Sequence, residues 1–454
     1  MKFLFGAVAA LAIGACVQTQ QAADEPTENA LEVEVYDGEF ATIQQFVTPG
    51  GISVWLVEEP SIPILSLRMA WQVGTTSDPN EQIGLTNAMV YQMNEGAGDL
   101  DSQAFFKRME ELNMSFGCSA GREATFCNAS MLTENADEAF DLITLAYAEP
   151  RFDEGPWERF VREQEVSLKT RETNARYLAG EALEEVLWPD HPFARDFTAE
   201  SLEALSAEAA KAHKDKIMSR SGMLVTAVGA ISPQDLAPLI DAAAAGLPET
   251  GIEIDIPQVT LAEPVSDPIT VSLEQPQSLV TFTGPAMRQD DPDFYTAVVL
   301  NYTFGGGGFE SRLMEDLRVA RGLTYGIYSR VSSGEYAQTW GGSGSTNNDS
   351  VVEFIEGIKE NMTLMVAEGM TEKELADAKS YLIGSYPLGF DSNAKIAGNM
   401  MGLRLDGLPV DFWDKRNAMV EAVTLEDVNR IAREYLKPEN FTFIAVGQPQ
   451  GLDG

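Results

Sequence analysis

The sequence predicts an α+β protein of two homologous α/β-sandwich domains, each of about 200 residues, joined by a linker. Three observations support this fold class. The 454 residues are too many for one hydrophobic core and enough for two. A helix–strand pattern near the end of the first half recurs near the end of the second. Between the halves, residues 248–268 are rich in Pro, Glu and Asp and show neither helix nor strand periodicity.

The recurring pattern can be aligned within this one chain. Residues 205–229 lie over residues 423–447 without a gap. Each copy begins with an N-cap residue, Ser206 or Thr424, runs through a helix, and closes on a strand that ends Ala-Val-Gly. Equal length with an identical terminal tripeptide favours internal duplication. We therefore divide the chain into a first domain at 37–247, a linker at 248–268 and a second domain at 269–454.

Apolar runs predict strands at the start of each half, and apolar residues at helical spacing predict the helices that follow. In the first half the strands are 51–57 and 64–70, and the helices are 84–96, 102–112, 134–148 and 157–186. Small alternating residues at 115–131 predict a β-hairpin between the second and third of these helices. In the second half the strands are 269–273 and 278–283, and the helices are near 290–304, 311–320, 349–368 and 371–385.

The charge balance is strongly acidic. Seventy acidic residues against 31 basic ones give a net charge of −39, and no basic stripe is present. This balance argues against nucleic-acid binding, which needs a positively charged surface. Two interpretations of the acidity stay open. It is either a solvated surface, as in proteins from salty water, or a field at a cleft that attracts basic peptides.

The N-terminus resembles a bacterial export signal. One Lys precedes an apolar run at 3–15, which is too short to span a bilayer. The run ends in Ile-Gly-Ala-Cys, which resembles a lipobox, so we expect a signal peptide at 1–16 and a lipid on Cys16. The alternative is an ordinary signal peptide, cut at Ala15 or at Ala22–Ala23. The polar, acidic segment 17–36 predicts a flexible tether.

These features predict a protein of the periplasm or cell envelope, attached to the outer membrane by its lipid alone. In such an oxidising compartment two cysteines can form a disulfide. With a two-residue turn at Arg122–Glu123, Cys118 and Cys127 stand directly opposite each other in the predicted hairpin. Either a disulfide or a pair of buried free thiols fits this placement.

The most informative segment is 300–329. Four glycines lead into a helix, Gly322 ends it, and a strand follows. Arg318 precedes Tyr325 by seven residues in the pattern L-R-x-x-x-G-L-x-Y. Spacing alone is also compatible with an Arg that caps helix carbonyls and a half-buried strand Tyr. No Lys-Ser/Thr follows the glycines, so the run does not resemble a phosphate-binding loop.

The pattern resembles the C-terminal-half signature of the insulinase/pitrilysin-like (inverzincin) metallopeptidases, most closely their bacterial processing-peptidase branch. The resemblance covers roughly residues 45–450 and is stronger in the second half. It implies that Arg318 holds the substrate backbone and that Tyr325 stabilises the tetrahedral oxyanion, since a guanidinium and a phenol are preorganised donors. A contact with substrate is also expected, with less support, for the glycines Gly305, Gly306, Gly307 and Gly308.

The zinc motif of that family, H-x-x-E-H, is degenerate in the first half. The flanking residues fit the family, but the motif positions hold Asn87, Val90 and Tyr91. None replaces a zinc-binding His or the Glu that activates water. The third family ligand should fall between Glu163 and Glu172, nearest 168–170. With only two histidines, His191 and His213, and no cysteine cluster, we expect no metal and no other cofactor in this chain.

The sequence therefore predicts a zinc-less subunit that is inactive alone. Paired with a homologous subunit that carries H-x-x-E-H and zinc, it would contribute Arg318 and Tyr325 to the cleavage of peptides or unfolded proteins. The alternative is a non-catalytic envelope lipoprotein, structural or peptide-binding, descended from such peptidases.

Overall fold

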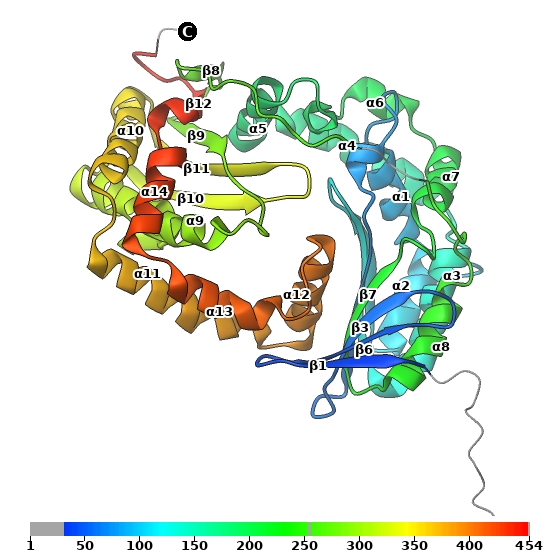
Figure 1. Cartoon of the computed structure of the whole chain (residues 1–454). Helices are drawn as coiled ribbons and strands as arrows, with labels where there is room; N and C mark the ends of the chain where they lie inside the picture. The colour runs from blue at the N-terminus through cyan, green and yellow to red at the C-terminus, as the bar shows by residue number, and fades with distance from the viewer. Residues whose placement is uncertain (1–30, 253–255, 453–454) are drawn as a thin grey trace, which may run out of the picture.

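The computed structural model describes residues 31–252 and 256–452 and shows two α/β halves, each built on one β-sheet (Figure 1). This architecture confirms the predicted fold class of two homologous domains. Cys16, the predicted site of lipid attachment, and most of the predicted tether lie outside the described residues. Within them, no helix is long and apolar enough to cross a membrane.

The first half contains a seven-stranded sheet in the order β1-β2-β3-β7-β4-β6-β5. β3 pairs with β7 in parallel, and the other neighbouring pairs are antiparallel. The strands are β1 (Val33–Asp37), β2 (Thr42–Val47), β3 (Ser53–Glu58), β4 (Ile64–Trp71), β5 (Ser115–Ala120), β6 (Thr125–Leu132) and β7 (Leu224–Gly229).

The second half contains a five-stranded sheet in the order β10-β11-β9-β12-β8. Here β8 and β12 are the parallel pair. Read from the other end, this order matches β3-β7-β4-β6-β5 of the first sheet strand for strand. The strands are β8 (Ile269–Ser272), β9 (Gln277–Pro285), β10 (Thr324–Ser333), β11 (Gln338–Asn347) and β12 (Thr442–Gly447).

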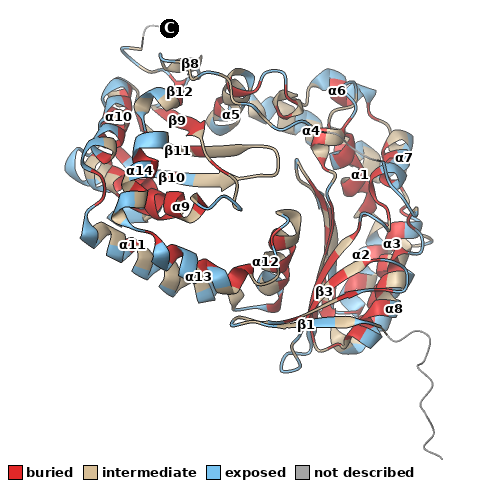
Figure 2. Cartoon of the chain, viewed as in Figure 1, coloured by how far each residue is buried: buried red, intermediate tan, exposed pale blue. Residues whose placement is uncertain are grey.

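Helices cover one face of each sheet and form its main core, shown in red in Figure 2. Those of the first half are α1 (Leu85–Met93), α2 (Ser102–Glu111), α3 (Ala136–Ala148), α4 (Glu154–Arg171), α5 (Ala175–Leu187), α6 (Ala199–Ala204), α7 (Ala207–Ile217) and α8 (Pro233–Ala244). Those of the second half are α9 (Phe294–Asn301), α10 (Val351–Glu368), α11 (Glu372–Ser385), α12 (Asn393–Leu405), α13 (Phe412–Ala422) and α14 (Leu425–Tyr435).

The two halves exchange one helix each. α5 belongs to the first half, yet its Ala179 packs against Leu279 and Ile444 of the second sheet. In return, α12 from the second half packs on β4 and β7 of the first sheet. Strands β7 and β12 are therefore covered on both faces, which explains why their sequences, LVTAVG and TFIAVG, are nearly continuous apolar runs.

The repeat predicted from the sequence is present in the structure. Residues 205–229 form α7 and β7, and residues 423–447 form α14 and β12. The predicted N-caps act as expected, because the Ser206 hydroxyl accepts from Ala209 N and the Thr424 hydroxyl accepts from Asp427 N. Both copies end on an interior strand of their sheet.

The structure corrects two details of the prediction. The tether prediction for 17–36 is wrong at its end, because residues 33–37 form β1. This strand pairs with β2, and its Tyr36 hydroxyl donates to Asp414 of the second half. The single helix predicted at 157–186 is divided into α4 and α5. Asn174 caps the start of α5 by accepting from two backbone N–H groups, so the chain turns before it crosses to the second sheet.

The connector between the halves lies against the protein for much of its described length. Its backbone N–H groups at Val259 and Ala262 donate to carbonyls of Tyr336 and Leu187, and its Leu261 packs beside Trp188. The linker is therefore held by residues of both halves.

Candidate functional site

Arg318 and Tyr325 lie at consecutive structural elements of the second half. Arg318 is on a π-helical segment, Met314–Ala320, and Gly322 follows with a φ of +66°, a conformation that favours glycine. Tyr325 comes next, near the start of the edge strand β10. The helix, break and strand predicted around these two residues are all present.

A β-bulge gives Tyr325 its direction. The pairing of β10 with β11 shifts between Thr324 and Ile327, so Tyr325 and Gly326 together oppose one residue of β11. The Thr324 hydroxyl fixes the bulge, since it donates to the Ser345 carbonyl at 2.7 Å and accepts from the Gly326 N–H at 3.1 Å. Thr324 and Ile327 are buried against the core, and Tyr325 is 84% exposed.

In the described part of the protein, the Tyr325 hydroxyl and the Arg318 guanidinium form neither a side-chain hydrogen bond nor an ion pair. The Tyr325 hydroxyl has no hydrogen-bond partner there. The Arg318 guanidinium stacks over the exposed ring of Phe309, 4.3 Å from the ring centre, and forms no ion pair with any described residue. A cation held by a ring keeps its N–H edge free for another acceptor. The two side chains are therefore available to a ligand.

The glycine run has a packing role. An added Cβ would come within 2.4 Å of the Ser329 hydroxyl at Gly305, within 2.6 Å of Asn301 Nδ2 at Gly306 and within 2.7 Å of the Tyr302 carbonyl at Gly307. Gly308 has a φ of +59° and open space around it. The glycines let the turn after α9 pack closely on β10, and contact of this run with substrate stays a prediction.

The degenerate zinc positions are all on α1, in three different environments. Asn87 is exposed, and Val90 is buried in the core. The Tyr91 hydroxyl accepts from Arg159 Nε at 3.1 Å, and its ring packs on Phe160 of α4. Arg159 also forms an ion pair with Glu95, just beyond the end of α1.

These residues do not fit a zinc ion. Burial raises the pKa of the Tyr91 phenol, so this side chain stays a neutral hydroxyl rather than an anionic ligand. The guanidinium of Arg159 already supplies the positive charge beside Tyr91 and Glu95. The α4 carboxylate that acts on Tyr91 is Glu163, five residues before the position extrapolated for the third ligand. Among residues 31–252 and 256–452, no three His, Cys, Asp or Glu side chains form a metal-binding group.

Both histidines have structural partners. His213 is buried, and its Nε2 lies 2.9 Å from the Thr86 hydroxyl, which donates to the buried Asp78 carboxylate. His191 precedes a short 3₁₀ turn, where its Nδ1 accepts from Phe193 N and its Nε2 lies 2.8 Å from the Pro257 carbonyl. In the described part of the protein, neither ring forms a hydrogen bond with Asn87, Val90 or Tyr91.

A polar pocket of about 600 Å³ opens beside α1 and was not anticipated from the sequence. Asn87 is the degenerate zinc position that lines it. The charged groups on its wall pair with one another: Arg171 stacks on the Tyr177 ring, and the Tyr177 hydroxyl donates to Asp196. These residues come from the end of α4, from α5 and from the loop that follows α5.

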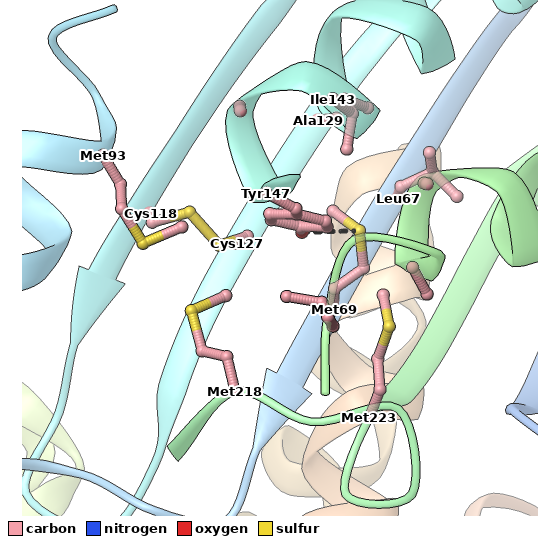
Figure 3. Close-up of a cluster of buried hydrophobic side chains, with 14 of the residues drawn as sticks. Leu67, Met69, Met93, Cys118, Cys127, Ala129, Ile143, Tyr147, Met218 and Met223 are labelled. Atoms are coloured by element: carbon pink, nitrogen blue, oxygen red, sulfur yellow. Dashed lines mark hydrogen bonds between the residues drawn. A yellow bond between two sulfur atoms is a disulfide. The ribbon is translucent and has the colours of Figure 1, made fainter. Parts of the chain in front are cut away.

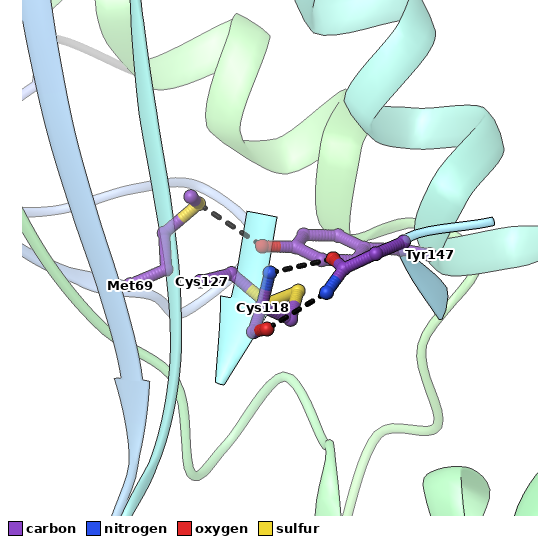
Figure 4. The surroundings of a disulfide bond; sticks show 5 residues. Met69, Cys118, Cys127 and Tyr147 are labelled. Atoms are coloured by element: carbon purple, nitrogen blue, oxygen red, sulfur yellow. Dashed lines mark hydrogen bonds between the residues drawn. A yellow bond between two sulfur atoms is a disulfide. The ribbon is translucent and has the colours of Figure 1, made fainter. Parts of the chain in front are cut away.

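The hairpin cysteines form a disulfide in the structure, between the opposed residues Cys118 of β5 and Cys127 of β6 (Figure 3 and Figure 4). The bridge is buried among methionines, and Tyr147 donates to the sulfur of Met69 nearby. On its outer edge, Cys118 exchanges two backbone hydrogen bonds with the side chain of Asn94, which follows α1. The disulfide ties the edge strand β5 to β6, and Asn94 ties the same strand to the end of α1.

Comparisons with known proteins agree with this geometry. The insulinase (peptidase family M16) model matches residues 53–199, and the peptidase M16 inactive-domain model matches residues 204–382. The chain is 24% identical over 409 residues to a protein of Helicobacter pylori called a non-peptidase homolog, YmxG, covering 89% of this chain and 94% of that one. It is 22% identical over 415 residues to an uncharacterized zinc protease, YmxG, of Bacillus subtilis, covering 90% and 99%.

A solved structure described as a peptidase M16 inactive domain, from Pseudomonas fluorescens, superposes with a TM-score of 0.84 at 25% identity. It covers 91% of this chain and 99% of that one. The two matched models together span well over half of the chain, and the second match runs from the end of the first half into the second half. The matches, the duplicated fold and the degenerate metal motif on α1 lead to one conclusion: the chain belongs to the insulinase (peptidase M16) family, as a member without its own zinc site.

Proposed function

We propose that this protein is the non-zinc subunit of a two-chain, insulinase-like peptidase. One observation carries the proposal. A chain whose zinc positions are filled by Asn87, Val90 and Tyr91 still presents an exposed Tyr325 and an Arg318 without an acidic partner in the described residues. The names of the Helicobacter relative and of the Pseudomonas structure support the lack of activity in the chain alone.

In the proposed complex, a homologous subunit that carries H-x-x-E-H holds zinc, which activates the attacking water. This chain contributes hydrogen-bond donors. The Tyr325 phenol donates to the oxygen that becomes negative as the peptide carbonyl is attacked, and Arg318 donates to a neighbouring backbone carbonyl of the substrate. Because the bulge fixes the direction of Tyr325 before substrate arrives, little reorganisation is needed at the moment of reaction.

The test is the change Tyr325→Phe in the complex of this chain with its zinc-bearing partner. Removing one oxyanion donor typically lowers turnover about 10²–10³-fold, so we expect kcat to fall by that factor with KM little changed. Arg318→Ala is expected to raise KM as well, because a backbone contact serves ground and transition states alike. Peptide hydrolysis by the purified complex measures both constants.

Two controls accompany this test. Tyr381→Phe alters another exposed tyrosine, on α11, and should leave hydrolysis unchanged. Elemental analysis should find no stoichiometric zinc in the isolated chain. Unchanged hydrolysis with Tyr325→Phe would contradict the proposed role and would favour a structural or peptide-binding protein that catalyses nothing.

A further inference from the structure

One face of the second sheet is covered over only part of its width. The register places Tyr328 of β10, Ser343 of β11, Thr281 of β9 and Ile444 of β12 in one row across the sheet. Residues in one such row share a face of the sheet. Ile444 packs against α5, so Tyr328 lies on the α5 face. α5 covers the β9–β12 side of this face and leaves the β10–β11 side bare.

The β10–β11 side of this face carries large side chains on β10 and small residues next to them on β11. Strand alternation places Arg330 on the same face as Tyr328, and the bulge adds Tyr325. Arg330 is exposed and Tyr328 is 51% exposed. Their direct neighbours on β11 are Gly341 and Ser343, which are too small to cover them. The result is a strip of small β11 residues, bordered by the larger β10 side chains on one side and by the part of the sheet that α5 covers on the other.

Arg330 has no counter-charge. Its side chain makes neither a hydrogen bond nor an ion pair with any residue in the described part of the chain, and the Tyr328 hydroxyl likewise has no partner there. Strands β9, β10, β11 and β12 contain no Asp or Glu, although 70 acidic residues occur in the protein. An unpaired guanidinium on strands that carry no acidic residue favours an anionic ligand.

The rest of the molecule restricts what that ligand is. A net charge of −39 repels polyanions such as nucleic acids at long range. A single carboxylate carried on a mostly neutral chain avoids most of this repulsion and still reaches Arg330. The strip of small residues runs along a strand, an arrangement that suits an extended peptide. Tyr325, the residue assigned to the oxyanion, stands on the same face of the same strand.

We propose that Arg330 and Tyr328 form a specificity site for an Asp or Glu side chain of an extended peptide bound along β10, with the Arg330 guanidinium donating two parallel hydrogen bonds to the carboxylate. The proposal rests on the proposed function, since it places this site on the same peptide that Tyr325 contacts. At roughly 3.3 Å per residue, Tyr325 and Arg330 are separated by about four or five residues of an extended chain. The acidic side chain is therefore expected at that distance from the cleaved bond.

The test measures peptide binding to the isolated, full chain, without the zinc-bearing partner. The probes are fluorescently labelled, unstructured peptides of one sequence that differ only in Glu, Gln or Lys at one position, followed by fluorescence anisotropy. We expect the wild type to bind the Glu peptide about tenfold more tightly than the Gln peptide, as a charge-assisted pair allows. Arg330→Gln should remove this preference, and Arg330→Glu should reverse it in favour of the Lys peptide.

Arg433→Gln is the matched control. It makes the same change at an exposed arginine on α14, a helix on the opposite face of the sheet, and should keep the preference for Glu. Equal affinity of the wild type for all three peptides, or no binding of any of them, would overturn this inference. Either result leaves the role of Tyr325 to be judged by turnover in the complex, so the two proposals fail separately.

Discussion

Arg159 places a positive charge beside Tyr91, one of the residues that replace the zinc ligands, and beside Glu95. Its guanidinium donates to the Tyr91 hydroxyl and pairs with Glu95, whose side chain is only 13% exposed. Glu95 also accepts from the Ser102 hydroxyl at 2.6 Å. Because the Arg159 guanidinium pairs with Glu95, this carboxylate is not left as an uncompensated buried charge in a protein without the metal.

This arrangement predicts a cost for removing Arg159. Arg159→Met keeps most of the aliphatic length and leaves Glu95 and Tyr91 without their shared donor. Because the Arg159 side chain is 41% exposed, we expect a loss of about 1 kcal/mol in the free energy of unfolding, measured by urea denaturation. Arg162→Met, on the same helix with a weaker exposed pair to Glu158, should cost less than about 0.5 kcal/mol. Equal losses in the two variants would contradict the special role of Arg159.

The individual residues at the site were only partly predictable. The positions of Asn87, Val90 and Tyr91 on one helix follow from the motif they replace, and the exposure of Tyr325 follows from a family pattern. Arg159 gave no signal, because its partners are 64 and 68 positions away in the sequence and an Arg in an acidic amphipathic helix looks like an ordinary surface residue. The same holds for Arg330, whose lack of an acidic neighbour depends on four strands brought together by the fold.

At the scale of elements, the sequence predicted helix caps and hairpins well, because these depend on residues close together in the chain. It predicted poorly those strands that are held mainly by their pairing with other strands. The caps at Ser206 and Thr424 and the hairpin register of Cys118 with Cys127 depend on nearby residues, and both predictions match the structure. Strand β11, with sequence QTWGGSGSTN, has little strand propensity and is held by β9 and β10. Its position could not be read from periodicity.

One asparagine has an equivalent in each half, but the alignment of the sequence repeat did not reveal this correspondence. Asn94 follows α1 and bonds the β5 edge at Cys118, while Asn301 ends α9 and bonds the β10 edge at Ser329. In each half an amide side chain donates to a backbone carbonyl of the edge strand. Asn94 also accepts from the Cys118 backbone N–H, whereas Asn301 accepts from the Ser329 hydroxyl. The spacing between the two asparagines differs from that of the aligned repeat, so only the structure brings them into correspondence.

The tips of the two hairpins meet in a cluster of like charges. The Glu123 carboxylate, at the tip of the β5–β6 hairpin, accepts from the backbone N–H groups of Glu335 and Tyr336, at the tip of the β10–β11 hairpin. Asp406, at the end of α12, faces the same group. Burial, together with Glu123 and Glu335, raises the pKa of Asp406 to about 6, and Arg288 only partly opposes this shift.

A raised carboxyl pKa has a defined effect on stability. The folded protein holds this proton up to about pH 6, whereas an unfolded Asp loses it near pH 4, so the destabilisation grows as pH rises between these values and is complete above them. Asp406→Asn should therefore raise the free energy of unfolding by about 1–2 kcal/mol at pH 7.5 and change it little at pH 4. Denaturant titrations at both pH values measure this, with Asp141→Asn on the exposed side of α3 as the control. A gain that is equal at both pH values would refute the charge argument.

At the scale of the whole molecule, the exchange of α5 and α12 makes each half depend on the other. Ala179 of the first half is 1% exposed in an apolar cluster with Leu279 and Val446 of the second sheet. Met400 of the second half is fully buried against Val228 of the first sheet. Duplication alone would allow two independent domains, and the helix exchange removes that independence. We therefore expect the halves to unfold as one unit.

The change Ala179→Asp tests this coupling. It places a charge in the apolar contact of α5 with the second sheet, which should cost about 3 kcal/mol or more. If the halves are coupled, hydrogen exchange followed by mass spectrometry should accelerate in β9 and β12, which contact α5, and equally in β4 and β7, which lie in the other half. Ala376→Asp, an exposed position on α11, should change neither sheet. Faster exchange confined to the second sheet would show that the halves unfold separately. The peptide site proposed along β10 would then be lost whenever the second half opened alone, whereas a coupled molecule keeps Arg318, Tyr325 and Arg330 in fixed positions relative to the first half.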